Sequence, residues 1–132
     1  MTLYSQHIMD FFLKYETKAV VIACNTASAV AFQHLKRNYN IPLFDVVSPS
    51  VEYSMKITKT QKIGVVGTYS TIQSRAYKRM FKDLGDTCTI QEIPCPLFVP
   101  IIEEGWANSS IARGIAKIYL NDFTNSDIDT LI

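Results

Sequence analysis

The chain has 132 residues, of which 48% are hydrophobic and 19% are charged, and its formal net charge is +1. This length is compatible with one domain, and the apolar content argues against intrinsic disorder. The near-neutral charge gives no electrostatic reason to expect nucleic acid or an anionic membrane as a partner.

The cysteine content and the N-terminal segment indicate the compartment. Cys24, Cys88 and Cys95 form no CxxC pair and no disulfide framework. With two isolated histidines they do not supply the three or four converging ligands of a zinc site, so no metal is predicted. No apolar run approaches the roughly 20 residues that span a bilayer. The opening stretch MTLYSQHIMDFFLKYE lacks the basic region and cleavage site of a signal peptide. We therefore expect a cytoplasmic protein that binds neither nucleic acid nor a membrane.

Helical and strand patterns alternate through the first half of the chain. Apolar residues at helical spacing predict an amphipathic helix at the start: Tyr4, Ile8, Phe11, Phe12 and Tyr15. Residues 18–24 read as a strand covered on both faces, and residues 27–39 as a helix. A second strand is predicted over 41–47, and Ser48-Pro49 separates it from a short helix through Met55.

The second half continues the alternation. A third buried strand, KIGVVGT, is predicted over 62–68, and a helix over 71–84 stops at Gly85. Residues 87–93 alternate as a fourth strand, and the prolines between 94 and 100 predict a loop with a short Glu-rich turn. A helix over 108–123 is expected to turn four residues inward: Ile111, Ile115, Ile118 and Tyr119. Residues 129–132 begin an apolar strand, and the whole pattern predicts an α/β fold with a mainly parallel sheet.

The triplet Cys24-Asn25-Thr26 interrupts an apolar run at the end of the first predicted strand. In open α/β sheets, ligands bind beyond the carboxyl ends of the strands. A helix N-terminus at this point favours an anion and a thiolate, and Asn25 and Thr26 add donors for a carboxylate. The alternative is a buried structural cysteine followed by an ordinary Asn/Thr helix cap.

Two further stretches have both a functional and a purely structural interpretation. Thr68 and Thr71 place hydroxyls at the next strand-to-helix turn, where a helix cap alone also explains them. Glu103-Glu104 puts two carboxylates beside Trp106, and such pairs are usually exposed to solvent. Cys88 and Cys95 are predicted to be structural.

Four segments together resemble the glutamate racemases of the aspartate/glutamate racemase family. They are KAVVIACNTASAVA, IPLFDVVSPS, KIGVVGTYSTIQSRAY and CPLFVPIIEEGW, in the family's order and over most of the chain. The resemblance implies two similar Rossmann-like parallel-sheet domains with the active site between them. Both are expected to be incomplete, with residues 1–48 belonging to the first domain and 49–132 forming most of the second.

The resemblance also implies a site and a chemistry. Enzymes of this family interconvert L- and D-glutamate without a cofactor, using one cysteine on each face of the α-carbon, and supply D-glutamate for peptidoglycan. Cys24 resembles the first catalytic cysteine, and Asn25 and Thr26 resemble ligands of the substrate carboxylate. Thr68, Thr71 and Glu103 match other pocket residues, although Glu104 is an alternative to Glu103. Most members dimerise, so a homodimer is expected of the parent enzyme.

Two family motifs are missing from this sequence. The glycine-rich Asp-Ser motif with its Pro-Tyr-Gly segment is not found at the start, and the second catalytic segment, Cys-Thr-His, does not follow DTLI. We therefore expect an interior piece of a longer protein that does not racemise glutamate alone. The alternatives are a related aspartate or hydantoin racemase, and a non-catalytic remnant or carboxylate-binding module.

Overall fold

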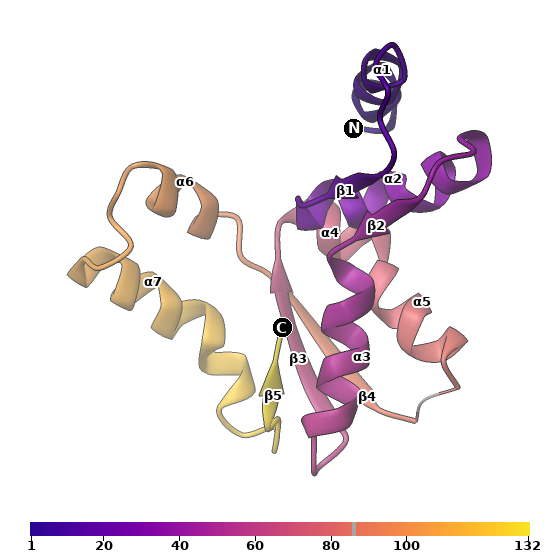
Figure 1. Ribbon diagram of the computed structural model, residues 1–132. Helices are drawn as coiled ribbons and strands as arrows, with labels where there is room; N and C mark the ends of the chain where they lie inside the picture. Colours follow the sequence, from indigo (N-terminus) through magenta and orange to yellow (C-terminus); the bar gives the residue numbers. More distant parts are fainter. Residues whose placement is uncertain (86) are drawn as a thin grey trace.

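The computed structural model describes residues 1–85 and 87–132 and shows an α/β fold with two parallel sheets (Figure 1). One sheet pairs β1 (Val20–Ile22) with β2 (Leu43–Asp45). The other has β3 (Lys62–Gly67) between β4 (Thr89–Pro94) and β5 (Thr130–Leu131). All these pairings are parallel. The predicted α/β class is confirmed, and both sheets are partial.

Helices connect the strands and flank the three-stranded sheet. They are α1 (Thr2–Phe12), α2 (Asn25–Asn38), α3 (Val47–Ile57), α4 (Tyr69–Ser74), α5 (Ala76–Asp83), α6 (Phe98–Glu103), α7 (Ser110–Leu120) and the 3-10 helix η1 (Asn121–Phe123). Figure 1 shows α3 and α5 on one side of this sheet and α6 and α7 on the other, with α1 beside α2. Within the described residues, no helix is long and apolar enough to cross a membrane.

The main core lies between β3 and the helices α3 and α5. Ile63 and Val65 of β3 are fully buried, as the apolar run KIGVVG predicts for a central parallel strand. The buried members of this core are Ala29, Val47, Val51, Ile63, Val65, Tyr77 and Phe81. A smaller cluster of Met9, Ala31 and Leu35 joins α1 to α2. Burial of each large aliphatic side chain contributes about 1.5–3 kcal/mol.

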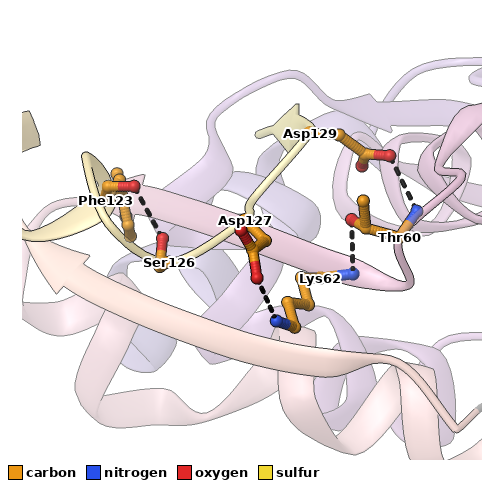
Figure 2. Close-up of polar contacts among 6 residues, drawn as sticks. All are labelled: Thr60, Lys62, Phe123, Ser126, Asp127 and Asp129. Atoms are coloured by element: carbon orange, nitrogen blue, oxygen red, sulfur yellow. Dashed lines mark hydrogen bonds and ion pairs between the residues drawn. The ribbon is translucent and has the colours of Figure 1, made fainter.

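A carboxylate fastens β5 to the loop before β3. Asp129 accepts hydrogen bonds from the Thr58 hydroxyl at 2.7 Å and from the backbone N–H of Lys59 at 2.6 Å. It also accepts one from the backbone N–H of Thr60 at 2.9 Å (Figure 2). The hydrogen bond from the Thr58 hydroxyl contributes most to holding the pKa of Asp129 well below its usual range, and the two backbone N–H groups contribute the next largest part. These bonds fix the position of β5 against β3.

Several apolar side chains are more exposed than their sequence pattern predicts. Val21 of β1 is 63% exposed, so the expected cover on both faces of that strand is wrong. Of the α7 residues expected to face inward, Ile111 and Ile118 are exposed. At the start of the chain, α1 buries Met9 but leaves Tyr4, Ile8 and other apolar residues in solvent. Apolar periodicity identifies these elements, but burial requires a neighbouring element, and none of the described residues covers these faces.

Prolines and one unusual backbone conformation account for the other differences between the predicted helices and those in the structure. The expected loop after β4 contains the helix α6, and α3 begins at Val47, before the expected Ser48-Pro49 boundary. Pro49 and Pro100 lie in the first turns of these helices, where a missing backbone N–H costs nothing. The predicted helix over 71–84 is two helices, because Arg75 adopts a left-handed conformation with φ 53°.

The division into residues 1–48 and 49–132 stays a prediction. Its boundary falls in the first turn of α3. Val47 and Val51 of that helix pack in the main core with Ile63 of β3. The helix that contains the predicted domain boundary thus covers the three-stranded sheet.

Candidate active site

Two strand-to-helix turns converge on one pocket of about 260 Å³. Cys24, Asn25 and Thr26 come from the turn between β1 and α2. Thr68 and Thr71 come from the turn between β3 and α4. The remaining lining residues are Val66, Gly67, Tyr77, Cys95, Phe98 and Val99. Residues more than 40 positions apart in the chain thus meet where β1 and β3, strands of two different sheets, end.

Three threonine hydroxyls join the two turns. The Thr26 oxygen lies 2.9 Å from that of Thr68 and 3.1 Å from that of Thr71. The Thr68 and Thr71 oxygens are 3.0 Å apart. Each hydroxyl can donate one hydrogen bond and accept two, so the triangle is mutually satisfied. We call Thr26, Thr68 and Thr71 the hydroxyl triangle.

The polar residues at the start of α2 do not act as its cap. Cys24 is the N-cap residue, and it is exposed and makes no side-chain cap hydrogen bond. Thr26 contributes its hydroxyl to the triangle, and Asn25 accepts a hydrogen bond from Tyr77. The interpretation of this segment as a buried structural cysteine and a helix cap is therefore wrong.

Thr68 combines a structural role with its place in the pocket. Its oxygen accepts a hydrogen bond from the Thr71 backbone N–H at 3.2 Å and so caps α4. The cap interpretation of Thr68 is confirmed. Because the hydroxyl also contacts Thr26, the same side chain fixes the helix start and faces the opposite turn.

Two ionisable groups in the pocket wall are buried. Tyr77 is 3% exposed. Its burial is the main cause that raises the pKa of its phenol, and the charge of Asp45 is the second cause. Cys95 is 1% exposed, and burial raises the pKa of its thiol. Both groups favour their neutral, protonated forms. Cys24 is thus the exposed thiol of this pocket.

The remaining candidate residues lie elsewhere. Glu103 is the last residue of α6 and Glu104 follows it, and both are exposed and outside the pocket lining. Cys88 is half-buried and packs against the main core. Residues 1–85 and 87–132 contain no group of three or more His, Cys, Asp or Glu side chains placed to hold a metal ion.

The family model for Asp/Glu/Hydantoin racemase matches residues 5–129. The chain belongs to this racemase family. A glutamate racemase of Sulfurihydrogenibium sp. (strain YO3AOP1) is 45% identical over 118 residues, covering 89% of this chain and 45% of the relative. A glutamate racemase of Geobacter metallireducens is 36% identical over 132 residues, covering 100% of this chain and 49% of the relative. The chain spans about half the length of these curated relatives.

Solved racemase structures share the fold. A glutamate racemase isoform of Bacillus anthracis aligns with a TM-score of 0.93 at 32% identity, covering 98% of this chain and 49% of that one. The Francisella tularensis glutamate racemase, solved in complex with D-glutamate, aligns with a TM-score of 0.88 at 32% identity over the same shares. The expected resemblance to glutamate racemases within this family is confirmed.

Sequence reasoning assigned no role to Tyr77. The signal available was a tyrosine in a predicted helix, next to Ala76 on its apolar face. A buried phenol needs a hydrogen-bond partner, but the partner cannot be predicted from the sequence. The partner, Asn25, lies 52 positions earlier in the chain.

Proposed function

We propose that this chain is the central part of an enzyme that interconverts L- and D-glutamate without a cofactor. The observation that supports it most directly is the pocket where Cys24 meets Thr68 and Thr71. In the proposed complex, Asn25 donates to a substrate carboxylate, and Thr26 turns its single hydroxyl proton from the triangle to the same carboxylate. Thr68 and Thr71 remain paired with each other and line the pocket, and the N-terminus of α2 adds partial positive charge. Glu103, which is exposed and outside the lining of the pocket in this structure, is proposed as a further substrate-binding residue of the parent enzyme.

Cys24 is proposed to act as a base. Its thiolate takes the α-proton, and hydrogen-bond donors stabilise the negative charge that develops on the substrate. Inversion requires a second group to return a proton to the opposite face. Cys95 is not proposed for this role because its side chain is only 1% exposed. We therefore propose that the 132-residue chain alone does not racemise glutamate.

The biological setting belongs to the same proposal. The parent enzyme is proposed to work in the cytoplasm as a homodimer and to supply D-glutamate for peptidoglycan. Its active site is proposed to lie between two similar domains, to which residues 1–48 and 49–132 contribute. Neither nucleic acid nor a membrane is proposed as a partner.

Proton exchange and inversion can be measured separately. The chain is incubated with D-glutamate in deuterated water, proton NMR follows loss of the α-hydrogen, and circular dichroism follows inversion. We expect slow α-hydrogen exchange with retained configuration, abolished in Cys24→Ala and kept in the control Cys88→Ala. Sustained loss of optical activity would show that the proposed inactivity is wrong. Faster exchange of the α-hydrogen of aspartate than of glutamate would indicate one of the related racemases.

A second candidate is a carboxylate-binding module without turnover. The observation that favours it is that Cys24 is the exposed thiol of the pocket, with no second one among the described residues. Binding of D-glutamate without any α-hydrogen exchange, in a chain whose Cys24 still reacts with iodoacetamide, would support this candidate over the racemase.

A further inference from the structure

Tyr77 connects the main core to the pocket. Its side chain is 3% exposed and belongs to the core with Val65 and Phe81, while it also lines the pocket. A buried hydroxyl that lacks a hydrogen-bond partner destabilises the fold. Among the described residues, the partner of this hydroxyl is Asn25, whose Oδ1 accepts its hydrogen bond at 3.4 Å.

The break at Arg75 makes this contact possible. Thr71 and Tyr77 are six positions apart, and on one continuous helix their side chains would point about 120° apart. The left-handed Arg75 redirects the chain between α4 and α5. Thr71 and Tyr77 consequently line the same pocket.

The hydrogen bond with Tyr77 decides which end of the Asn25 amide is left for the pocket. An amide has one acceptor oxygen and one donor NH₂ group at opposite sides. Asn25 is exposed, so without a partner its amide can turn either way. Tyr77 keeps its proton at neutral pH because burial and the Asp45 charge raise its pKa. The phenol donates to Oδ1, so Nδ2 is the end of the amide that remains for the pocket.

We propose that Tyr77 is a positioning residue that holds the Asn25 amide with its NH₂ group toward the pocket, where it donates to a ligand carboxylate. The amide orientation follows from the contact between these two side chains. The carboxylate part rests on the proposed function. A tyrosine that only fills the core would leave Asn25 unchanged when its hydroxyl is removed.

The orientation can be tested by NMR without any ligand. In ¹⁵N-labelled chain, the Asn25 side-chain amide is assigned as the signal that disappears in Asn25→Asp. Tyr77→Phe should shift this signal and increase its motion, while the control Tyr4→Phe, on an exposed tyrosine, should leave it unchanged. An unchanged Asn25 signal in folded Tyr77→Phe overturns the proposal.

A reciprocal measurement does not require Tyr77→Phe to fold. In chain labelled with ¹³C at tyrosine Cζ, Asn25→Ala should shift the Tyr77 signal, because the phenol loses its acceptor. Thr26→Val, in the same turn, should shift it less. A Tyr77 signal unaffected by Asn25→Ala contradicts the inferred contact.

Titration with D-glutamate separates this inference from the proposed function. Tyr77→Phe should weaken binding about 3- to 10-fold, the effect of one hydrogen bond, and Asn25→Ala by at least as much. The double variant should bind no more weakly than Asn25→Ala, because Tyr77 acts through Asn25. If the unmodified chain does not bind D-glutamate, the proposed substrate is wrong while the NMR result still decides the amide orientation. Equal binding by the unmodified chain and Tyr77→Phe overturns the positioning role.

Discussion

Removing one hydroxyl from the triangle should measurably loosen the connection between the two turns. Thr71→Val keeps the size and β-branched shape of a side chain that is 2% exposed. It removes the Oγ1 atom that lies 3.1 Å from Thr26 and 3.0 Å from Thr68. The Thr71 backbone N–H still donates to Thr68, so the cap of α4 is retained.

The expected magnitude follows from what remains after the substitution. A net hydrogen bond contributes about 0.5–1.5 kcal/mol, and two are removed. Thr26 and Thr68 still contact each other at 2.9 Å, so neither is left unpaired. We therefore expect the free energy of unfolding to fall by about 1–3 kcal/mol. Thr68→Val also removes the helix cap, which adds about 1 kcal/mol to the loss.

Urea denaturation followed by far-ultraviolet circular dichroism measures these differences. Thr71→Ser is the matched control, because it keeps the hydroxyl and loses only the methyl group beside Gly67. The expected order of stability is unmodified chain, then Thr71→Val, then Thr68→Val. The reasoning is refuted if Thr71→Val equals the unmodified chain, or if Thr68→Val is the more stable of the two variants.

Three other predictions concern the hydrogen bonds of Asp129, the thiols, and the smaller cluster that joins α1 to α2. Asp129→Asn should lower the unfolding temperature at pH 7, because a carboxylate with a lowered pKa stabilises the fold only while it is ionised. The difference in unfolding temperature between this variant and the unmodified chain should narrow below about pH 4. A difference that stays constant down to pH 2 contradicts this. Iodoacetamide at neutral pH should modify Cys24 and spare Cys95, which is 1% exposed, as peptide mass spectrometry can show; equal modification argues against the described pocket. Leu35→Ala should cost about 2–5 kcal/mol in unfolding free energy and make α1 sensitive to protease, whereas a loss below about 1 kcal/mol would place Leu35 outside a packed core.

The order of elements and the positions of most candidate residues could be predicted from the sequence. Apolar runs such as KIGVVGT identify central strands because parallel strands are buried on both faces. Cys24 and Thr68 follow predicted strands, and ligands bind at the carboxyl ends of parallel strands. That rule marked each turn as a candidate site, but β1 and β3 belong to different sheets, so it did not predict that the two turns meet.

Other features depended on contacts that local sequence does not encode. The exposure of Ile118 depends on whether another element covers α7. The break between α4 and α5 depends on a left-handed backbone conformation at Arg75, which a non-glycine residue rarely adopts. Pro100 lies inside α6 because the helix begins just before it.

The sequence by itself determined the α/β alternation, the family and the residue types at the two turns, because spacing and composition act over a few residues. The tertiary structure alone decided that Thr26 meets Thr68 and that Tyr77 meets Asn25. These partners are 42 and 52 positions apart in the chain. Their distances are set by how α2 packs against α4 and α5, which depends on the whole fold.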